Sequence, residues 1–425
     1  MANISSSNSL GENVPKLRFP GTKGNFFTDY THNTVRGLFT RITQRNTEGI
    51  TNVITNSAEH GLIPHRDFFD KSIAVDGNIS NYYVIKSGDF VYNPRKSNQA
   101  PYGPFNCYNY MDEGIVSPLY TCLRPKMKEY TEFLLWYFKS PVWHSYIYHN
   151  GAQGGARHDR VGMTTELMDG IPINLPCISE QQKIVSFLNL IERKAAIQSK
   201  LVDLLKLYKR GLLSKLFPQK GESVPQYRFT GFTDAWEQRK LGELASSFEY
   251  GLNAAAKEYD GKNKYIRITD IDDISHEFLT DEVTSPDIDL SISDNYRLSV
   301  GDILFARTGA SVGKTYIYKA SDGLVYYAGF LIRARIKKGY NPEFVFQNTL
   351  TANYEKYITV TSQRSGQPGV NAQEYSEYKI MVPSKAEQDK ISTYLRSFDH
   401  LIILYQKKYD FYEKEKLALL QQMFI

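Results

Sequence analysis

The sequence contains little cysteine and tryptophan and has no long apolar segment. Three cysteines and three tryptophans occur among 425 residues. An odd, low number of cysteines in a long chain does not form a disulfide framework, so we expect a reducing, cytoplasmic location. No uninterrupted apolar run reaches the roughly 18 residues of a membrane helix, and the mean hydropathy is −0.42. The first fifteen residues lack the basic start and apolar core of a secretory signal. We therefore expect no association with a membrane.

The chain also has only a small excess of basic over acidic residues. The chain has 51 Lys and Arg residues against 46 Asp and Glu residues, a formal net charge of +5. This balance excludes a histone-like basic protein, and it permits nucleic-acid binding without demanding it. Hydrophobic residues make up 41% and charged residues 23% of the chain, which excludes a mostly disordered protein.

What the sequence does contain is an internal repeat, in three blocks. The blocks are VPKLRFPG at 14–21 with VPQYRFTG at 224–231, IKSGDFVY at 85–92 with LSVGDILF at 298–305, and PCISEQQKI at 176–184 with PSKAEQDKI at 383–391. They occur in the same order at offsets of 210, 213 and 207 residues. The chain is therefore a tandem duplication of a unit of about 210 residues.

Two segments share a heptad pattern. Mostly apolar residues recur in alternating steps of four and three from Ile184 to Leu216 and again from Ile391 to Met423. A period of 3.5 residues over about five heptads is typical of a coiled-coil seam. Lys209 and Lys416 occupy matching seam positions, where polar residues commonly fix register. Packing of each helix on its own domain, or dimerisation through the helices, stays open as an alternative. The duplication favours an antiparallel pair within one chain.

Both repeats follow the same plan, which predicts an α+β fold. Two globular α/β domains are joined by two long helices that form an antiparallel coiled-coil spacer with pseudo-twofold symmetry. Short strands are predicted at 302–306 and 315–318, and short helices at 132–140 and 343–350. The predicted boundaries are 1–24 for an N-terminal tail and lead-in segment, 25–176 for domain 1, 177–217 for the central helix, 218–234 for a second lead-in segment, 235–383 for domain 2, and 384–425 for the C-terminal helix.

Several catalytic motifs are incomplete or missing. Residues 308–315 (TGASVGKT) resemble a phosphate-binding loop, but Thr308 replaces the first glycine and the continuation TYIY reads as a strand, not as a helix. The eight histidines contain no HExxH or other metal spacing. Carboxylates are numerous, yet none of them is singled out as an acid–base pair. The residues alone therefore predict no catalytic centre.

Four segments carry a family resemblance. They are residues 224–242 (VPQYRFTGFTDAWEQRKLG), 301–309 (GDILFARTG), 366–371 (GQPGVN), and Pro383 with Glu387 and Gln388. Together with the duplicated plan over essentially the whole chain, they resemble the specificity subunit of Type I restriction-modification enzymes. Domain 1 diverges from the pattern, since Asn93-Pro94-Arg95 stands where domain 2 has Ala306-Arg307-Thr308. Two domains that read different half-sites would keep the same framework and differ in their loops.

The resemblance implies a non-enzymatic subunit that binds double-stranded DNA. Each globular domain would be a target-recognition domain that reads one half-site of a bipartite target. The subunit would direct two methyltransferase subunits and, in the full complex, restriction subunits. No cofactor is expected in this chain, whereas S-adenosylmethionine, ATP and Mg are expected on the partner subunits.

Candidate DNA-binding residues are polar or basic side chains on predicted loops, because base edges are read by such groups. For each residue taken singly, a solvated-loop role is the alternative. Gly88, Asp89, Gly301 and Asp302 are interpreted as turn framework. The candidates are Asn93, Arg95, Lys96, Ser97, Asn98, Gln153, Arg157, His158 and Arg160 in domain 1, and Arg307, Thr308, Ser311, Lys314, Gln363, Arg364, Ser365, Gln367 and Asn371 in domain 2.

Two rival functions remain. A fused methyltransferase or nuclease would need a catalytic motif, and a coiled-coil scaffold without sequence specificity would leave two variable domains unexplained. Residues 177–217 hold eight Lys or Arg and three Asp or Glu, which equals the whole excess of +5. The rest of the chain is therefore neutral overall, and DNA binding must depend on local loop charges and on partner subunits.

Overall fold

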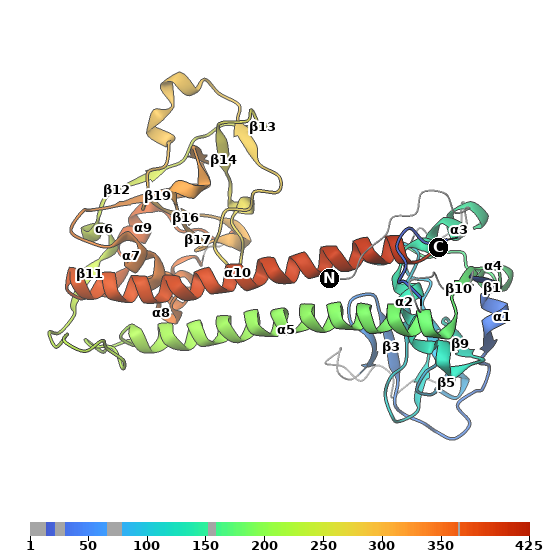
Figure 1. Ribbon diagram of the computed structural model, residues 1–425. Coiled ribbons are helices and arrows are strands. Elements are labelled where there is room, and N and C mark those ends of the chain that lie inside the picture. Colours follow the sequence, from blue (N-terminus) through green and yellow to red (C-terminus); the bar gives the residue numbers. More distant parts are fainter. Residues whose placement is uncertain (1–13, 22–29, 66–78, 152–158, 364–365) are drawn as a thin grey trace. The chain divides into compact units, whose positions relative to one another are not determined.

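The computed structural model describes residues 14–21, 30–65, 79–151, 159–363 and 366–425 (Figure 1). The chain divides into two compact units. Unit 1 comprises residues 1–197 and 409–425, and unit 2 comprises residues 198–408. The division passes through both long helices, so each unit contains part of each helix. None of the described helices is long and apolar enough to cross a membrane.

A four-stranded antiparallel sheet with the order β2-β9-β6-β7 is the largest sheet of unit 1. Three further antiparallel pairs, β1–β10, β3–β4 and β5–β8, accompany it. The elements are β1 (Thr31–Thr34), α1 (Val35–Leu38), β2 (Phe39–Arg41), β3 (Ile54–Ser57), β4 (Gly61–Pro64), β5 (Tyr83–Ile85), β6 (Phe90–Tyr92), β7 (Phe105–Cys107), β8 (Gly114–Val116), β9 (Thr121–Pro125), α2 (Thr131–Lys139), α3 (Val142–Asn150), α4 (Thr165–Asp169), β10 (Pro172–Leu175) and the first half of α5 (Ile178–Leu216).

Unit 2 repeats this plan and adds a second four-stranded sheet. Its first sheet has the order β12-β19-β16-β17, and its second has the order β13-β15-β14-β18, in which β14 and β18 are parallel. The elements are β11 (Glu237–Lys240), α6 (Leu241–Leu244), β12 (Ala245–Tyr250), β13 (Ala256–Glu258), β14 (Lys264–Ile266), β15 (Thr284–Pro286), β16 (Ile303–Ala306), β17 (Thr315–Ile317), β18 (Val325–Tyr327), β19 (Leu331–Ile336), α7 (Pro342–Asn348), α8 (Ala352–Thr361), α9 (Ala372–Ser376), β20 (Lys379–Val382) and the first half of α10 (Lys385–Met423).

The duplication seen in the sequence extends to strand pairing. The pair β1–β10 corresponds to β11–β20, and the sheet β2-β9-β6-β7 corresponds to β12-β19-β16-β17. The predicted strands at 302–306 and 315–318 are β16 and β17, and the predicted helices at 132–140 and 343–350 are α2 and α7, each within two residues. The mixed helix and sheet content in two units is as predicted.

The repeated GD motif forms the same buried turn in both units. Gly88 and Gly301 have φ angles of 92° and 87°, a region that strongly favours glycine. The aspartate that follows accepts two hydrogen bonds from one guanidinium: Arg124 bonds Asp89 at 2.7 and 2.7 Å, and Arg335 bonds Asp302 at 3.0 and 3.0 Å. The carboxylate also accepts the backbone N–H three residues earlier in each unit, at 2.7 and 2.9 Å. The motif is therefore framework, as its sequence indicated.

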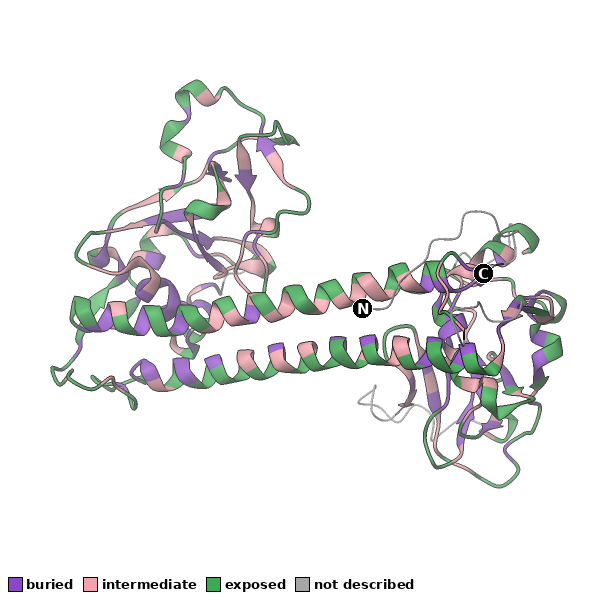
Figure 2. Ribbon diagram, viewed as in Figure 1, coloured by how far each residue is buried: buried purple, intermediate pink, exposed green. Residues whose placement is uncertain are grey.

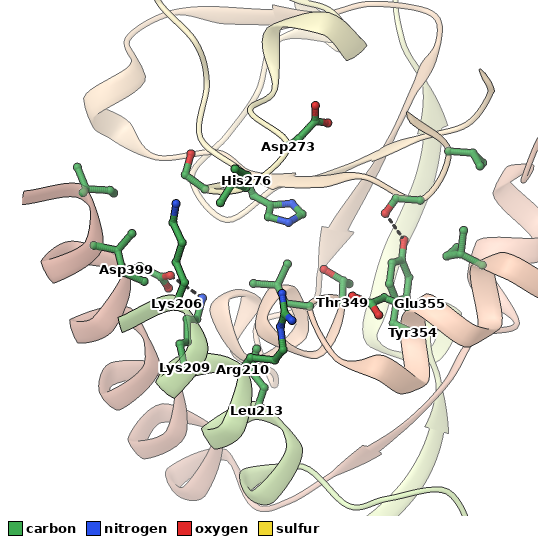
Figure 3. A pocket seen from close by; sticks show the side chains of 18 of the residues that line it. Lys206, Lys209, Arg210, Leu213, Asp273, His276, Thr349, Tyr354, Glu355 and Asp399 are labelled. Carbon is green, nitrogen blue, oxygen red and sulfur yellow. Dashed lines mark hydrogen bonds and ion pairs between the residues drawn. The ribbon is translucent and has the colours of Figure 1, made fainter. Parts of the chain in front are cut away.

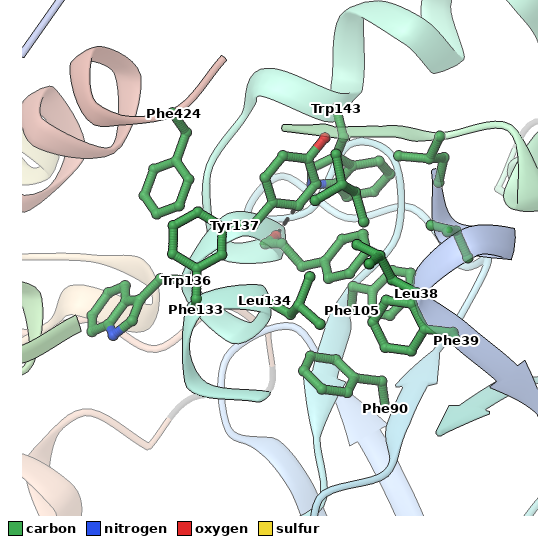
Figure 4. Packing of buried hydrophobic residues seen from close by; sticks show 14 of the residues in the cluster. Leu38, Phe39, Phe90, Phe105, Phe133, Leu134, Trp136, Tyr137, Trp143 and Phe424 are labelled. Carbon is green, nitrogen blue, oxygen red and sulfur yellow. Dashed lines mark hydrogen bonds between the residues drawn. The ribbon is translucent and has the colours of Figure 1, made fainter. Parts of the chain in front are cut away.

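Aromatic side chains dominate the core of unit 1 (Figure 4). The rings of Phe105 and Phe138 stack with centroids 3.7 Å apart. Phe424, just beyond α10, packs against Phe133 with ring centroids 5.3 Å apart. Residues from the last turn of α10 thus complete a core that is otherwise built from residues 35–188.

The two long helices pack against each other within each unit. In unit 1, Lys416 on α10 binds Glu192 on α5 at 2.8 Å, and Lys194 lies over the ring of Tyr412. Later residues of α5 thus contact earlier residues of α10, so the helices run antiparallel in this unit. In unit 2, Lys209 pairs with Asp399 at 2.5 Å. All seam positions of the heptad pattern are buried or half-buried (Figure 2).

Both lead-in segments attach to a long helix through the same contacts. Arg18 forms a two-point ion pair with Glu180 at 3.0 and 2.6 Å in unit 1, and Arg228 does the same with Glu387 at 2.9 and 2.7 Å in unit 2. The Leu17 N–H donates to the Gln422 carbonyl at 3.0 Å, and its counterpart at 227 donates to the carbonyl of residue 215 at 2.9 Å. The end of α10 therefore meets the first segment as the end of α5 meets the second.

Candidate nucleic-acid interface

Two predicted loops of unit 1 lie side by side. The Lys96 N–H donates to the Asp159 carbonyl at 2.8 Å, and the Val161 N–H donates to the Pro94 carbonyl at 2.8 Å. Between these bonds, Arg95 and Arg160 form an antiparallel bridge. Residues 94–97 and 159–161 therefore make one surface element, although more than sixty residues separate them in the sequence.

The equivalent loops of unit 2 are joined by the same contacts. The Gly309 N–H donates to the Pro368 carbonyl at 3.0 Å, and the Val370 N–H donates to the Arg307 carbonyl at 2.9 Å. Thr308 and Gly369 form the bridge between them. The offsets, 213 residues for the first loop and 209 for the second, follow the duplication. We call these elements the paired loops: 94–97 with 159–161 in unit 1, and 307–309 with 368–370 in unit 2.

Local sequence explains where each paired loop is placed. The first loop begins just after β6 or β16, and the second ends just before α4 or α9. Asn371 caps α9 by accepting the Glu374 N–H at 2.9 Å, and Thr164 caps α4 by accepting the Leu167 N–H at 3.1 Å. In unit 2, the buried Tyr375 of α9 donates to the Ala306 carbonyl at 2.6 Å, which fixes the helix to the base of the first loop.

The paired loops of unit 1 present several cations. Arg95, Lys96, Ser97 and Asn98 are exposed, and Arg160 is half-buried beside Arg95. Asn93 has a different role, since its amide donates to the Asn56 carbonyl at 3.0 Å and its side-chain oxygen accepts the Arg95 N–H at 3.0 Å. The structure thus brings five of the predicted residues to one surface and assigns Asn93 to its scaffold.

The paired loops of unit 2 present a different set. Arg307 and Thr308 are half-buried, while Gln367 is exposed. Two candidates serve the fold: Asn371 caps α9, and Lys314 donates to the Ile271 carbonyl at 3.0 Å and pairs with Asp273, so that its side chain is 11% exposed. Ser311 lies in the turn after the first loop, and Gln363 is exposed after α8.

Exposed apolar side chains next to the paired loops escaped the sequence analysis. Phe330 is 58% exposed and Tyr250 is 43% exposed, and both rings lie near Arg307. Leu119, the counterpart of Phe330 at an offset of 211, is 61% exposed. The signal that could have found Phe330 and Leu119 is an apolar residue after Gly or Pro at the same place in both repeats, just before β19 and β9. The predicted residues Gln153, Arg157, His158, Arg364 and Ser365 lie outside the described residues.

A separate cleft of about 500 Å³ lies in unit 2 (Figure 3). Lys206, Lys209 and Arg210 of α5 face Asp273 and His276 across it. Burial lowers the pKa of His276, and its Nδ1 lies 2.8 Å from the Thr315 carbonyl.

The acidic and basic groups that line this cleft balance in charge. The ion pair between Lys209 and Asp399 is part of a hydrogen-bond network that extends into the protein. Asp399 accepts a 2.8 Å hydrogen bond from Gln347, which also donates to Glu343 at 2.9 Å. Gln347 is fully buried, so this network ties α5 and α10 to α7. Among the described residues, no group of three or more His, Cys, Asp or Glu side chains could hold a metal ion.

The family model for the Type I restriction modification DNA specificity domain matches residues 233–410. The Type I restriction enzyme MjaVIII specificity subunit of Methanocaldococcus jannaschii is 24% identical over 264 residues, which cover 59% of this chain and 60% of that protein. A second protein of that organism, named for the MjaX specificity subunit, is 26% identical over 215 residues, covering 48% and 49%. The chain thus spans about half the length of the curated relatives that it matches.

Solved structures give the same fold over nearly the whole chain. The S subunit of a Type I restriction-modification system from M. genitalium has a TM-score of 0.57 at 14% identity, covering 97% of this chain and 99% of that chain. A chain from a study of assembly and conformational transition of the type I R-M system has a TM-score of 0.53 at 15% identity, covering 93% and 97%. The chain is therefore similar to Type I restriction-modification specificity subunits, through the matched domain at 233–410 and through its fold, as the resemblance in its sequence predicted.

Proposed function

We propose that this chain is the DNA-recognition subunit of a Type I restriction-modification complex. Unit 1 and unit 2 each read one half-site of a bipartite target, and the chain directs methyltransferase and restriction subunits to it. The chain itself is non-catalytic and cytoplasmic, and S-adenosylmethionine, ATP and Mg act on the partner subunits.

One observation carries the proposal: the paired loops have the same backbone in both units but different side chains. Identical hydrogen bonds hold Arg95 and Arg160 in unit 1 and Thr308 and Gly369 in unit 2. Two units that share a backbone arrangement but carry different surface side chains could recognise different base sequences, because donors and acceptors at base edges specify the sequence. A scaffold protein without sequence specificity would not require this repeated arrangement.

The spacing between half-sites would come from α5 and α10. We propose that the two helices act as an antiparallel coiled-coil spacer related by pseudo-twofold symmetry. The 39 residues of each helix give a length of about 58 Å at about 1.5 Å per residue. Base pairs between the half-sites would remain unread, and the gap would depend on helix length.

Exposed apolar residues on the same helices suit partner binding. Leu190, Ile197 and Leu204 recur every seven residues on α5 and are 50%, 61% and 62% exposed. At an offset of 207, Leu404 and Phe411 take the places of the last two on α10, with 41% and 61% exposure. A row of exposed apolar side chains on a helix is typical of an interaction surface. Duplicate surfaces would let two copies of a methyltransferase subunit dock in the same way.

The proposal is tested by mapping methylated bases in plasmid DNA from cells that express the full chain, the methyltransferase subunit of its system, or both. We expect a bipartite motif with an unread gap only when both proteins are present. Methylation by the chain alone would support the fused-enzyme alternative, and sequence-independent methylation with both proteins would support a scaffold.

A further inference from the structure

The guanidinium of Arg307 is held by aromatic rings. Its Cζ atom lies 5.0 Å from the ring centroid of Tyr250 and 6.0 Å from that of Phe330. Within the described part of the chain, no side-chain hydrogen bond or ion pair engages this guanidinium. By contrast, Arg335 in the same unit binds both oxygens of Asp302. The five N–H donors of Arg307 are thus not engaged by other described groups of the protein.

The three residues are fixed although they lie at the surface. The Arg307 N–H donates to the Phe330 carbonyl at 3.0 Å, and its own carbonyl accepts the Val370 N–H at 2.9 Å. The Tyr250 hydroxyl accepts the Ala372 N–H at 3.2 Å, which ties the end of β12 to the start of α9. A stacked guanidinium loses less conformational freedom on binding than a mobile side chain, because its plane is already oriented.

The surroundings of Arg307 favour a base edge over a phosphate. Its neighbours in the paired loops, Thr308, Gly309, Pro368 and Gly369, carry no charge. Two exposed aromatic rings would be poorly placed against a hydrated phosphate strand, whereas apolar groups do contact bases in the major groove. A planar fork of donors matches the O6 and N7 acceptors of guanine, the commonest specific arginine contact.

We propose that Arg307 reads a guanine in the half-site recognised by unit 2, with Tyr250 and Phe330 as positioning residues for its guanidinium. This inference rests on the proposed function. It does not extend to unit 1, where Pro94 occupies the place of Arg307 and Leu119 that of Phe330. The guanine requirement should therefore belong to one half-site only.

The test is methylation mapping with the full chain and its methyltransferase subunit, comparing wild type with Arg307→Ala, Arg307→Lys and the control Lys338→Ala. Lys338 is exposed beyond β19, at the opposite end of that strand from Phe330. We expect that the motif methylated with either Arg307 variant no longer requires guanine at one position of one half-site. Discrimination against other bases at that position should fall about 5- to 150-fold. Arg307→Lys keeps the charge but not the fork, and Lys338→Ala should leave the motif unchanged.

Other outcomes would overturn the inference. A loss of DNA affinity in Arg307→Ala that is equal for all target sequences would indicate a phosphate contact. In that case the slope of log binding constant against log salt concentration should also become shallower by about one. For the positioning role, Phe330→Ala should weaken discrimination at the same guanine and Phe330→Tyr should retain it. Equal weakening at every position would instead indicate a general structural role. If the wild-type pair produces no bipartite motif, the proposed function itself fails, which is distinguishable from an unchanged motif in the Arg307 variants.

Discussion

At the level of single residues, two arginine–carboxylate ion pairs occur at equivalent places in both repeats: Arg18–Glu180 matches Arg228–Glu387, and Arg124–Asp89 matches Arg335–Asp302. The Arg18–Glu180 pair shows how strongly each partner depends on the other: the Glu180 side chain is fully buried and that of Arg18 is 7% exposed. Removing one member of such a pair leaves a buried charge without compensation. The pair also fixes the first lead-in segment to α5, so its loss should loosen both.

We expect Arg18→Met to lower the free energy of unfolding of the full chain by about 3–5 kcal/mol. The double variant Arg18→Met/Glu180→Leu should lose less than the single variant, because no charge remains unpaired. Urea unfolding monitored by circular dichroism measures both. A double variant as unstable as the single one would show that packing of the segment, not the uncompensated charge, dominates.

The cysteines differ in reactivity for a physical reason. Burial, with a smaller contribution from Asp89, raises the pKa of Cys107 and of Cys122 to about 12. Cys177, just before α5, is half-buried. The thiolate is the reactive form, so a raised pKa leaves almost none of it at pH 8.

Iodoacetamide at pH 8 should therefore modify one thiol of the folded protein quickly and the other two only after unfolding. Mass spectrometry of digested samples identifies the sites, and Cys177→Ser should remove the fast reaction. Rapid modification of Cys107 or Cys122 in the folded chain would contradict the burial of β7 and β9.

Among the secondary-structure elements, the long helices could be predicted from the sequence because they depend on local periodicity. The pairing of loops could not, because it depends on contacts between distant segments. The heptad pattern predicted helices at 177–217 and 384–425, and the structure has α5 at Ile178–Leu216 and α10 at Lys385–Met423. Pairing of residues 94–97 with 159–161 leaves no periodic trace, because it rests on two long-range backbone hydrogen bonds.

Residue type alone could not distinguish candidate DNA-contacting residues from residues that stabilise the fold. Lys314 and Asn371 have the right chemistry for DNA contact, yet one pairs with Asp273 and the other caps α9. Conversely, aromatic side chains are mostly buried in proteins, but β12 and the turn before β19 leave the rings of Tyr250 and Phe330 exposed.

The length of the helices should set the gap of the target. Insertion of four residues after Gln198 in α5 and after Tyr405 in α10 adds about 6 Å, nearly the rise of two base pairs. Coiled coils accommodate four-residue insertions by local unwinding. We expect a longer gap between unchanged half-sites in methylation maps. The same insertion in the loop at residues 219–222, outside both helices, should leave the gap as it is. An unchanged gap in the helix variant would contradict the spacer role.

At the scale of the whole molecule, the modest charge fits recognition within a complex. The excess of +5 equals that of residues 177–217, so the two globular domains carry no net surplus of cations. Phosphate contacts supply much of the affinity of DNA-binding proteins. Specific contacts from a few loop residues, combined with phosphate contacts from partner subunits, would give tight binding without a basic surface on this chain.

If each unit reads one half-site by itself, exchange of one domain should change the target in a defined way. In this variant, residues 235–383 are replaced by residues 25–176, and the protein is expressed with its methyltransferase subunit before methylated bases are mapped. We predict a symmetric target in which the half-site of unit 1 appears twice as an inverted repeat around an unread gap. Persistence of the original asymmetric motif in this chimaera would show that the two units do not each read one half-site.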